Sequence, residues 1–258
     1  VRGRYCTTRP LGAIADLFAA SIPAELRDAA ADVLPRYNIA PTQMVPIIRH
    51  EVEGPERGQR IVDFAHWGLV PSWAKDTSLA PRMINARSET VAEKPSFRGA
   101  FRHRRCLIPT CGFYEWKTDT TAANKPFKQP YRVHFSDGRM MVMAGLFEVW
   151  QAADGSALGS CSMLTTAASD AMRQLHPRMP VILDSEDEWD AWLSTRAEPE
   201  LLHGLCQAYS GDDFAFHPVD RAVGQVRNEG ASLLQPIDLN SASALHASAA
   251  NASQGRLL

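Results

Sequence analysis

The sequence lacks a long apolar run, a cysteine framework, an internal repeat and a strong net charge. No stretch approaches the roughly 20 apolar residues that a membrane-spanning helix needs, so no membrane role is expected. The five cysteines show no Cys-x-x-Cys spacing, which argues against a structural zinc site and a disulfide framework. The first residues do not form a basic and then apolar leader, so the cytoplasm is the expected compartment.

The net charge of −2 gives no general attraction to nucleic acid, but the charges are unevenly distributed. Residues 82–105 contain seven Lys or Arg against two acids, and residues 184–213 contain nine acids against one Arg. A basic face on a nearly neutral protein suits an anionic ligand that is bound locally. A solvated helix face is the alternative interpretation of the same pattern.

The composition is that of a globular protein, with 45% apolar and 22% charged residues in 258. Predicted helices over 10–20, 23–34 and 96–106 alternate irregularly with predicted strands, without a steady β-α-β rhythm. We therefore expect an α+β fold, a single compact domain of mixed, mainly antiparallel sheet with peripheral helices over residues 1–239. Residues 240–258 are rich in Ser and Ala and predict a flexible tail. We expect no bound metal or cofactor, and we expect the protein to be a monomer.

The clearest hairpin signal is PYRVHFSDGRMMVMAGLFEVW, residues 130–150, in which two apolar strands flank Asp137-Gly138. The segment RCLIPTCGFYEWK, residues 105–117, predicts a strand, a turn and a second strand. In the second strand, Phe113, Glu115 and Lys117 share one face, and Tyr114 and Trp116 share the other.

Glu115 is the first candidate for chemistry. A carboxylate buried between aromatic residues is costly unless it is paired, and such an environment is typical of working acids and bases. The alternative is a surface glutamate paired with Lys117.

His176 is the second candidate, because it follows a helix and precedes Pro177 and Arg178 in LHPRMP. The proline favours an extended backbone at His176, and Arg178 could bind an anion nearby. A structural histidine is the alternative interpretation.

Asn85 and Arg87 flank Ala86 in MINARSET, so in an extended segment both side chains point the same way. An amide beside a guanidinium suits a sugar-phosphate, although turn and capping chemistry would use the same residues. Trp67 and Trp73 lie in WGLVPSW, where Gly68 and Pro71 predict a loop. Exposed aromatics near arginines stack single-stranded nucleic acid, whereas core packing is the usual fate of tryptophan.

Eight blocks of the sequence form a recognisable series when they are taken in order: GRY, RYNIAPTQ, WGLVPSWAKD, MINARSET, RCLIPTCGFYEWK, AGLFEVW, LTTAASDAMRQLHPRMPVIL and HPVDRAVGQVRNEG. This series resembles the SOS response-associated peptidase family, also called abasic site processing proteins. The resemblance runs from Gly3 to about Ile237. It implies a compact domain with a positively charged cleft for single-stranded DNA that contains abasic sites. It also implies that an N-terminal cysteine forms a Schiff base and then a thiazolidine with the lesion, together with autoproteolysis and lyase behaviour.

The resemblance also assigns roles to individual residues of this chain. It implies that Asn85 holds the N-terminal amine and the sugar, that Glu115 is the acid/base, and that His176 carries a proton during ring opening. The DNA contacts that it implies are Arg4, Arg87 and Arg178 for phosphates, Trp67 and Trp73 for bases, and Thr165 for the sugar-phosphate.

Position 2 is where the chain departs from the family pattern, because Arg2 stands where the family has cysteine. Cys6 is no substitute, since a thiazolidine needs amine and thiol on one residue, and four extended residues span roughly 13 Å. Three interpretations remain open: residue 2 is cysteine in the natural protein, the chain binds abasic DNA without locking it, or a free amine forms a transient imine that promotes strand cleavage.

Two other functions also remain open. Cys111, in PTCGF, and His176 could form the dyad of a cysteine hydrolase or peptidase. The chain could also be a single-stranded DNA-binding module without chemistry.

Overall fold

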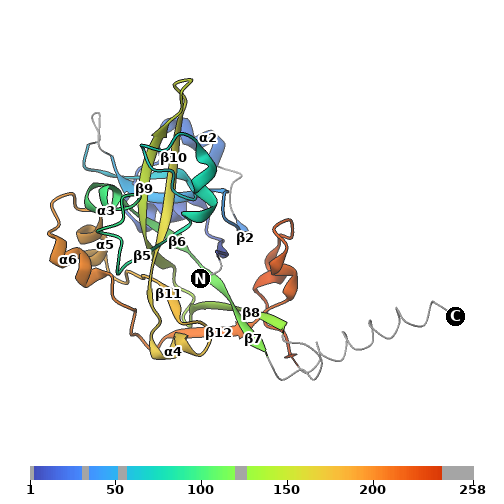
Figure 1. Cartoon of the computed structure of the whole chain (residues 1–258). Coiled ribbons are helices and arrows are strands. Elements are labelled where there is room, and N and C mark those ends of the chain that lie inside the picture. Colours follow the sequence, from blue (N-terminus) through green and yellow to red (C-terminus); the bar gives the residue numbers. More distant parts are fainter. Residues whose placement is uncertain (1–2, 31–34, 52–56, 120–126, 240–258) are drawn as a thin grey trace.

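The structure is a computed structural model that describes residues 3–30, 35–51, 57–119 and 127–239, with side chains omitted at 28–30 and 119. A five-stranded antiparallel sheet has the order β12-β8-β7-β1-β2. Its strands are β1 (Tyr5–Thr7), β2 (Arg36–Ile39), β7 (Gly112–Asp119), β8 (Phe127–Phe135) and β12 (Phe214–Pro218). In Figure 1, β7, β8 and β12 lie in the lower part of the molecule, and β2 lies higher, at the other edge of this sheet.

The second sheet has seven strands, and five of them close into a ring through the pairings β10-β4-β3-β6-β9-β10. The short strands β5 and β11 both pair with the far end of β10, β5 in parallel and β11 antiparallel. The strands are β3 (Met44–His50), β4 (Arg60–Trp67), β5 (Asn85–Arg87), β6 (Arg105–Thr110), β9 (Met141–Gln151), β10 (Ala157–Ala167) and β11 (Arg178–Pro180).

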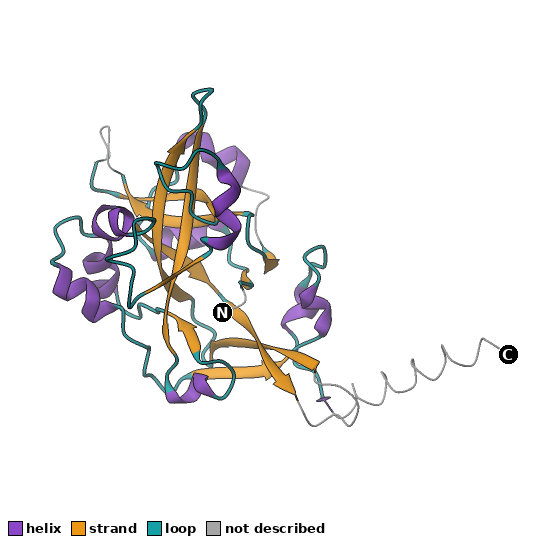
Figure 2. Cartoon of the chain, in the orientation of Figure 1, coloured by secondary structure: helices purple, strands orange, loops and turns teal. Residues whose placement is uncertain are grey.

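Short helices surround the sheets (Figure 2). They are α1 (Leu11–Leu17), α2 (Ala24–Ala30), α3 (Arg98–His103), α4 (Asp170–Arg173), α5 (Glu186–Leu193) and α6 (Pro199–Leu205), with 3₁₀ turns η1 (Thr77–Arg82), η2 (Arg221–Gly224) and η3 (Ala231–Leu234). Ser185 begins α5 as an N-cap, because its hydroxyl accepts a hydrogen bond from the Glu188 N–H at 3.2 Å. Among the described residues, no helix is long and apolar enough to cross a membrane.

Alternation along β7 places its side chains in two different cores. Phe113 belongs to the cluster between the two sheets, together with Trp67 and Met163. Tyr114 and Trp116 face the opposite side and pack with Val223, from η2. Glu115 shares the face of Phe113, as the sequence predicts, so its carboxylate points toward the seven-stranded sheet.

The hairpin predicted over residues 130–150 is wrong, although its turn is present. Gly138 has a φ of 72°, and the Asp137 carboxylate accepts a hydrogen bond from the Arg139 N–H at 2.9 Å. However, β8 pairs with β7 and β12, whereas β9 pairs with β6 and β10. The Asp-Gly turn therefore carries the chain from one sheet to the other, because each strand finds its partners elsewhere.

The predicted α+β fold, a single compact domain with mixed, mainly antiparallel sheets and peripheral helices, is confirmed. The helices predicted over 10–20 and 96–106 correspond to α1 and α3. The flexible tail predicted over residues 240–258 lies outside the described residues, as does Arg2.

Candidate functional site

Glu115 is fully buried, with 0% exposure, although it lies near the middle of β7. One carboxylate oxygen accepts a hydrogen bond from the Trp116 N–H at 3.1 Å. The other lies 4.0 Å from Nδ1 of His176, whose side chain is 27% exposed. The interpretation of Glu115 as a surface residue paired with Lys117 is therefore wrong, and the acid/base interpretation gains an imidazole neighbour.

His176 comes from the loop between α4 and β11, so it belongs to the seven-stranded side of the site. The Arg178 N–H donates to its Nδ1 at 3.1 Å, which fixes the orientation of the ring. The partly exposed imidazole lies between the buried Glu115 carboxylate and solvent, and this position suits a group that carries a proton in or out.

The start of the described chain lies against this pair of residues. Tyr5 pairs with Phe113, and the Tyr114 N–H donates to the Arg4 carbonyl at 2.9 Å. Continuing this antiparallel register by one residue brings residue 3 opposite Glu115. Gly3, the first described residue, is buried.

Gly3 also lies beside the segment that carries Asn85. A Cβ placed on Gly3 would lie 3.0 Å from Cγ of Pro41 and 3.1 Å from Cδ1 of Ile84, and the φ of Gly3 is +70°. Ile84 directly precedes Asn85, so residues 3, 85 and 115 converge at one place. Both the backbone conformation and the space favour glycine here.

Strand β5 presents Asn85 and Arg87 on one face. Ala86 is fully buried in the core beneath the helices, so its two neighbours point to the opposite side. Asn85 is half-buried, whereas Arg87 is exposed. The predicted shared face is confirmed, and it gives the site an amide in its interior and a cation at its rim.

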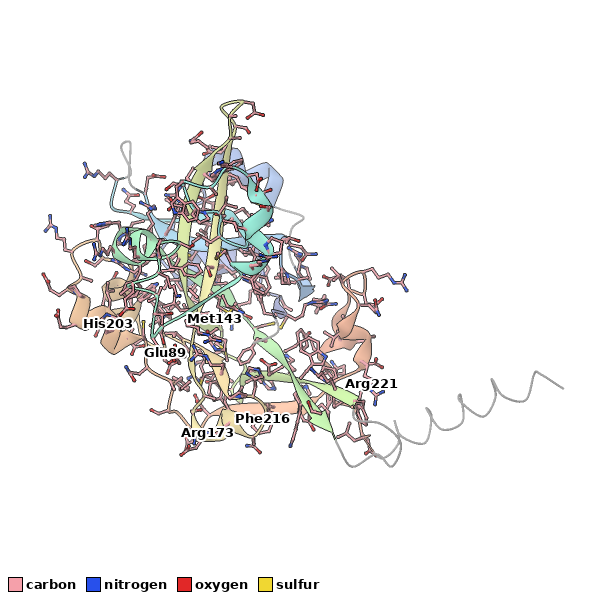
Figure 3. The ribbon with its side chains drawn as sticks, in the orientation of Figure 1. Glu89, Met143, Arg173, His203, Phe216 and Arg221 are labelled. Carbon is pink, nitrogen blue, oxygen red and sulfur yellow. The ribbon has the colours of Figure 1, made fainter. Side chains whose placement is uncertain are left out.

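Arg178 and Thr165 form part of the scaffold of this rim. Arg178 makes a two-pronged ion pair with Glu89, and its NH2 group donates to the carbonyl and hydroxyl of Thr165 at 2.6 and 3.1 Å. The hydrogen bond from Arg178 holds the pKa of Glu89 below its ordinary value. Figure 3 labels Glu89. Thr165 is only 4% exposed, and in this structure its carbonyl and hydroxyl hold Arg178; its contact with a sugar-phosphate stays a prediction.

Arg4 is likewise a structural residue in this conformation. Its NH1 group donates to Oδ1 of Asn38 at 2.8 Å and to the Val223 carbonyl at 2.9 Å, and its NH2 group donates to the Gly224 carbonyl at 3.1 Å. Burial lowers the pKa of Arg4 below its ordinary value. The guanidinium therefore ties the residue before β1 to β2 and η2, and its contact with a phosphate stays a prediction.

The two tryptophans have opposite environments. Trp67 is 1% exposed at the end of β4, packs edge-on against Tyr5 at 5.2 Å and donates its indole N–H to the Ile84 carbonyl at 2.9 Å. The expected loop position is therefore wrong for Trp67, which packs beside Gly3, and its contact with a base stays a prediction. Trp73 is 60% exposed in the following loop, so its ring is accessible from solvent.

That loop is anchored at the site at both ends. It leaves β4 through Gly68, whose N–H donates to the Cys161 carbonyl at 2.9 Å, and it returns to β5 through Ile84. Gly68 has a φ of +139°, and a Cβ there would lie 2.5 Å from the Ala80 carbonyl oxygen, so only glycine fits. Next to Trp73, the carbonyl of Ala74 accepts a hydrogen bond from the Trp150 indole N–H at 2.7 Å, which ties this part of the loop to the end of β9.

Cys111 and His176 have different neighbours. The Cys111 N–H donates to the Cys6 carbonyl at 2.9 Å, while His176 contacts Glu115. Cys111 precedes Glu115 by four positions, roughly 13 Å along an extended strand. This arrangement favours Glu115 over Cys111 as the partner of His176.

Sequence reasoning missed three residues that shape the site. Pro41 and Ile84 lie against Gly3, as described above. They belong to the motifs RYNIAPTQ and MINARSET, but nothing in those motifs indicates that they contact Gly3. Asn38 is fully buried and donates to the carbonyls of Gln225 and Asn228, each at 2.9 Å. Together with Arg4, it fastens the RAVGQVRNEG segment over β1 and β2. Within the described residues, no group of three His, Cys, Asp or Glu could hold a metal ion.

The fold and the site define an α+β protein in which β1 pairs with the strand that carries a buried carboxylate, Glu115, and in which the imidazole of His176 lies 4.0 Å from that carboxylate. The family model described as SOS response associated peptidase (SRAP) matches residues 1–226, and the chain belongs to that family.

Named relatives and solved structures agree with this assignment. The Abasic site processing protein YoqW of Bacillus subtilis is 37% identical over 202 residues, which cover 78% of this chain and 86% of the relative. The Abasic site processing protein HMCES of Mus musculus is 32% identical over 241 residues, covering 80% and 66%. A protein from Bordetella bronchiseptica has a TM-score of 0.67 at 27% identity, covering 84% of this chain and 99% of that one. A protein from Bacteroides thetaiotaomicron shares the fold, with a TM-score of 0.79 at 20% identity, covering 91% and 99%.

Proposed function

We propose that this chain binds abasic sites in single-stranded DNA as a monomer, in the cytoplasm, and presents its N-terminal residue to the ring-opened sugar. Membership of the family and the names of its relatives support this proposal. The observation that carries it is the burial of Gly3 between Pro41 and Ile84, opposite Glu115, with His176 4.0 Å from that carboxylate.

The chemistry expected of such a site is imine formation. A neutral α-amine adds to the aldehyde carbon of the abasic sugar, and the resulting carbinolamine loses its hydroxyl as water. In our proposal Glu115 supplies and recovers the proton for this dehydration, and His176 exchanges protons with the sugar oxygen. Asn85 holds the amine and the sugar through its amide.

Residue 2 decides how far the reaction goes. A thiol on the residue that carries the amine would add to the imine carbon and close a thiazolidine. Arg2 has no thiol, so we propose that the chain as printed recognises the lesion and forms at most a reversible imine, and only where residue 2 is the first residue. In this proposal the chain with Arg2 recognises the abasic site but does not form a permanent crosslink with it.

The DNA contacts in this proposal come from the rim. Arg87 is exposed at the end of β5 and binds a phosphate, and the exposed ring of Trp73 stacks a base next to the lesion. Arg178 supports this rim in its present pairing with Glu89, and it would meet a phosphate directly only after exchanging that carboxylate for it.

The proposal can be tested by trapping. The protein is produced behind a cleavable tag so that residue 2 becomes the first residue, in three forms: Arg2, Arg2→Cys and Arg2→Ser. Each form is incubated with a single-stranded oligonucleotide carrying one abasic site, and adducts are resolved on denaturing gels with and without borohydride. We expect a heat-stable adduct without borohydride for Arg2→Cys only, and borohydride-dependent adducts for the other two.

The serine form is the matched control, because it keeps the amine and lacks the thiol. All three forms should bind single-stranded DNA more tightly than duplex DNA. A preference for duplex DNA, or adducts of equal yield with an oligonucleotide lacking the abasic site, would contradict the proposal. Peptide cleavage that is lost on Cys111→Ala would instead support the hydrolase interpretation.

A further inference from the structure

Cys6 and Cys111 lie on neighbouring strands, apart from the Glu115 end of the site. Cys6 pairs with Gly112, and the Cys111 N–H donates to the Cys6 carbonyl at 2.9 Å, so residues 111 and 112 both oppose Cys6. This is the arrangement of a β-bulge. Residues paired across antiparallel strands have Cα atoms about 5.5 Å apart, and a disulfide spans Cα separations of about 4.4–6.8 Å.

A guanidinium lies beside this thiol pair. Arg132, from β8, donates through its NH2 group to the Cys111 carbonyl at 3.0 Å. Its Nε atom is buried and has no hydrogen-bond partner among the described residues. A cation held next to a half-buried sulfur stabilises the thiolate form, which is the nucleophilic one.

The two thiols differ in protonation. The pKa of Cys111 is lowered to about 6 by the hydrogen bond from the Cys6 thiol, with further contributions from Thr8 and Arg132 that act against burial. Burial and the same hydrogen bond raise the pKa of Cys6 well above its ordinary value. These opposite directions favour the thiolate on the more accessible Cys111 and the thiol on the fully buried Cys6, whose Sγ also donates to the Gly112 carbonyl at 3.2 Å.

We propose that Cys111 is a peroxide-reactive cysteine and that Cys6 is its resolving partner, so that a hydroperoxide converts the pair into a disulfide between β1 and β7. The Cys111 thiolate attacks one peroxide oxygen and breaks the O–O bond, which gives a sulfenic acid and, after protonation, water or an alcohol. The Cys6 sulfur then displaces the sulfenic hydroxyl as water. Two thiols are oxidised, one peroxide is reduced, and a dithiol reductant restores the starting state.

The disulfide would join the two strands that position the start of the chain. Strand β1 begins two residues after Gly3, and β7 carries Glu115. Oxidation would therefore fasten the N-terminal strand to the strand that bears the proposed acid/base. This activity is independent of DNA binding, since neither thiol belongs to the cluster of Asn85, Glu115 and His176.

The remaining cysteines provide internal controls. Burial raises the pKa of Cys106, Cys161 and Cys206, the last to about 12. Iodoacetamide labelling of the native full chain from pH 5 to 9, read by peptide mass spectrometry, should give fast modification of Cys111 alone, with a midpoint near pH 6. A rate at Cys111 that matches that of the unfolded chain, or a midpoint above pH 8, would overturn the proposal.

The disulfide is tested directly with hydrogen peroxide at pH 7, followed by alkylation under denaturing conditions. We expect three of the five thiols to remain alkylatable and the peptides containing Cys6 and Cys111 to be joined, within a monomer on non-reducing gels. Cys6→Ser should leave a sulfenic acid on Cys111 that dimedone traps, and Cys206→Ser should leave the yield of disulfide unchanged. Five free thiols after treatment, or a disulfide that involves another cysteine, would overturn the proposal even if both variants failed to fold.

Discussion

The five-stranded sheet holds Glu115 at 0% exposure, whereas the seven-stranded sheet presents Arg87 to solvent at the end of a three-residue strand. On the first side, residue 3 and Glu115 are positioned by the backbone pairing of β1 with β7. On the second side, Asn85, Arg87 and Arg178 are positioned by side chains and by short strands that add to the end of β10. The comparison shows that the small sheet buries the carboxylate of Glu115, whereas the large sheet contributes Asn85, His176 and the exposed Arg87 around it.

Glu115→Gln should have the largest effect, because it removes the proton donor while keeping the size of the side chain. In the Arg2→Cys protein with residue 2 first, we expect the rate of adduct formation to fall about 10²- to 10⁴-fold, the usual contribution of a general acid or base. Affinity for abasic single-stranded DNA should change less than about threefold, or roughly 0.6 kcal/mol. Single-turnover gel kinetics and fluorescence anisotropy measure the two effects. A rate that stays within threefold would place the chemistry elsewhere.

Trp73→Ala should show the opposite pattern. Loss of one stacked base costs about 1–3 kcal/mol of binding free energy, so affinity should fall while the adduct rate at saturating DNA is retained. Trp73→Phe is the matched variant that keeps a ring and should recover most of the affinity. If the alanine variant binds as tightly as the parent, the loop between Gly68 and Ile84 takes no part in binding.

Gly3→Ala should affect folding and reaction together. The left-handed φ of +70° costs a non-glycine residue about 1–2 kcal/mol, and the new methyl also meets Pro41 and Ile84 at 3.0 and 3.1 Å. Gly155→Ala is the control, since Gly155 has a φ of +85° with nothing within 4 Å of its Cβ position. Urea unfolding should show a larger decrease in the free energy of unfolding for Gly3→Ala than for Gly155→Ala. Only Gly3→Ala should slow adduct formation. Equal losses in the two variants would mean that residue 3 is not enclosed.

Arg87→Ala should have the smallest effect. Removal of one phosphate contact weakens binding to all single-stranded sequences alike and lowers the slope of log affinity against log salt by about 0.7. Arg98→Ala, on the exposed face of α3, is the control and should leave the slope unchanged. If Arg98→Ala lowers the slope and Arg87→Ala leaves it unchanged, the DNA binds along the basic face of α3 and not at Arg87.

The local pattern predicted which side chains share a face within single strands of both sheets. Alternation along GFYEWK placed Glu115 on the face of Phe113, and two-residue spacing placed Asn85 and Arg87 together. Both are properties of an extended backbone and need no knowledge of the tertiary fold. The wrong hairpin marks the limit of this reasoning: Asp137-Gly138 is a good turn, but strand partners are chosen by contacts far away in the sequence.

The roles of the arginines and tryptophans could not be predicted from spacing for the same reason. Arg4 and Arg178 both resemble phosphate ligands in the sequence, yet their donors are occupied by the Val223 carbonyl and by Glu89, respectively. Trp67 and Trp73 are six residues apart in one motif, and only their positions relative to Tyr5 and the sheet interface make one buried and the other exposed.

The most direct measurement is to locate the attachment point of the DNA. The protein with cysteine as its first residue is crosslinked to an abasic oligonucleotide, digested with trypsin and nuclease, and mapped by mass spectrometry. The mass of the ring-opened sugar should appear only on the peptide that contains residue 2, and Glu115→Gln should reduce its yield. Attachment to a lysine or to Cys111 would show that residue 2 is not the group that captures the lesion.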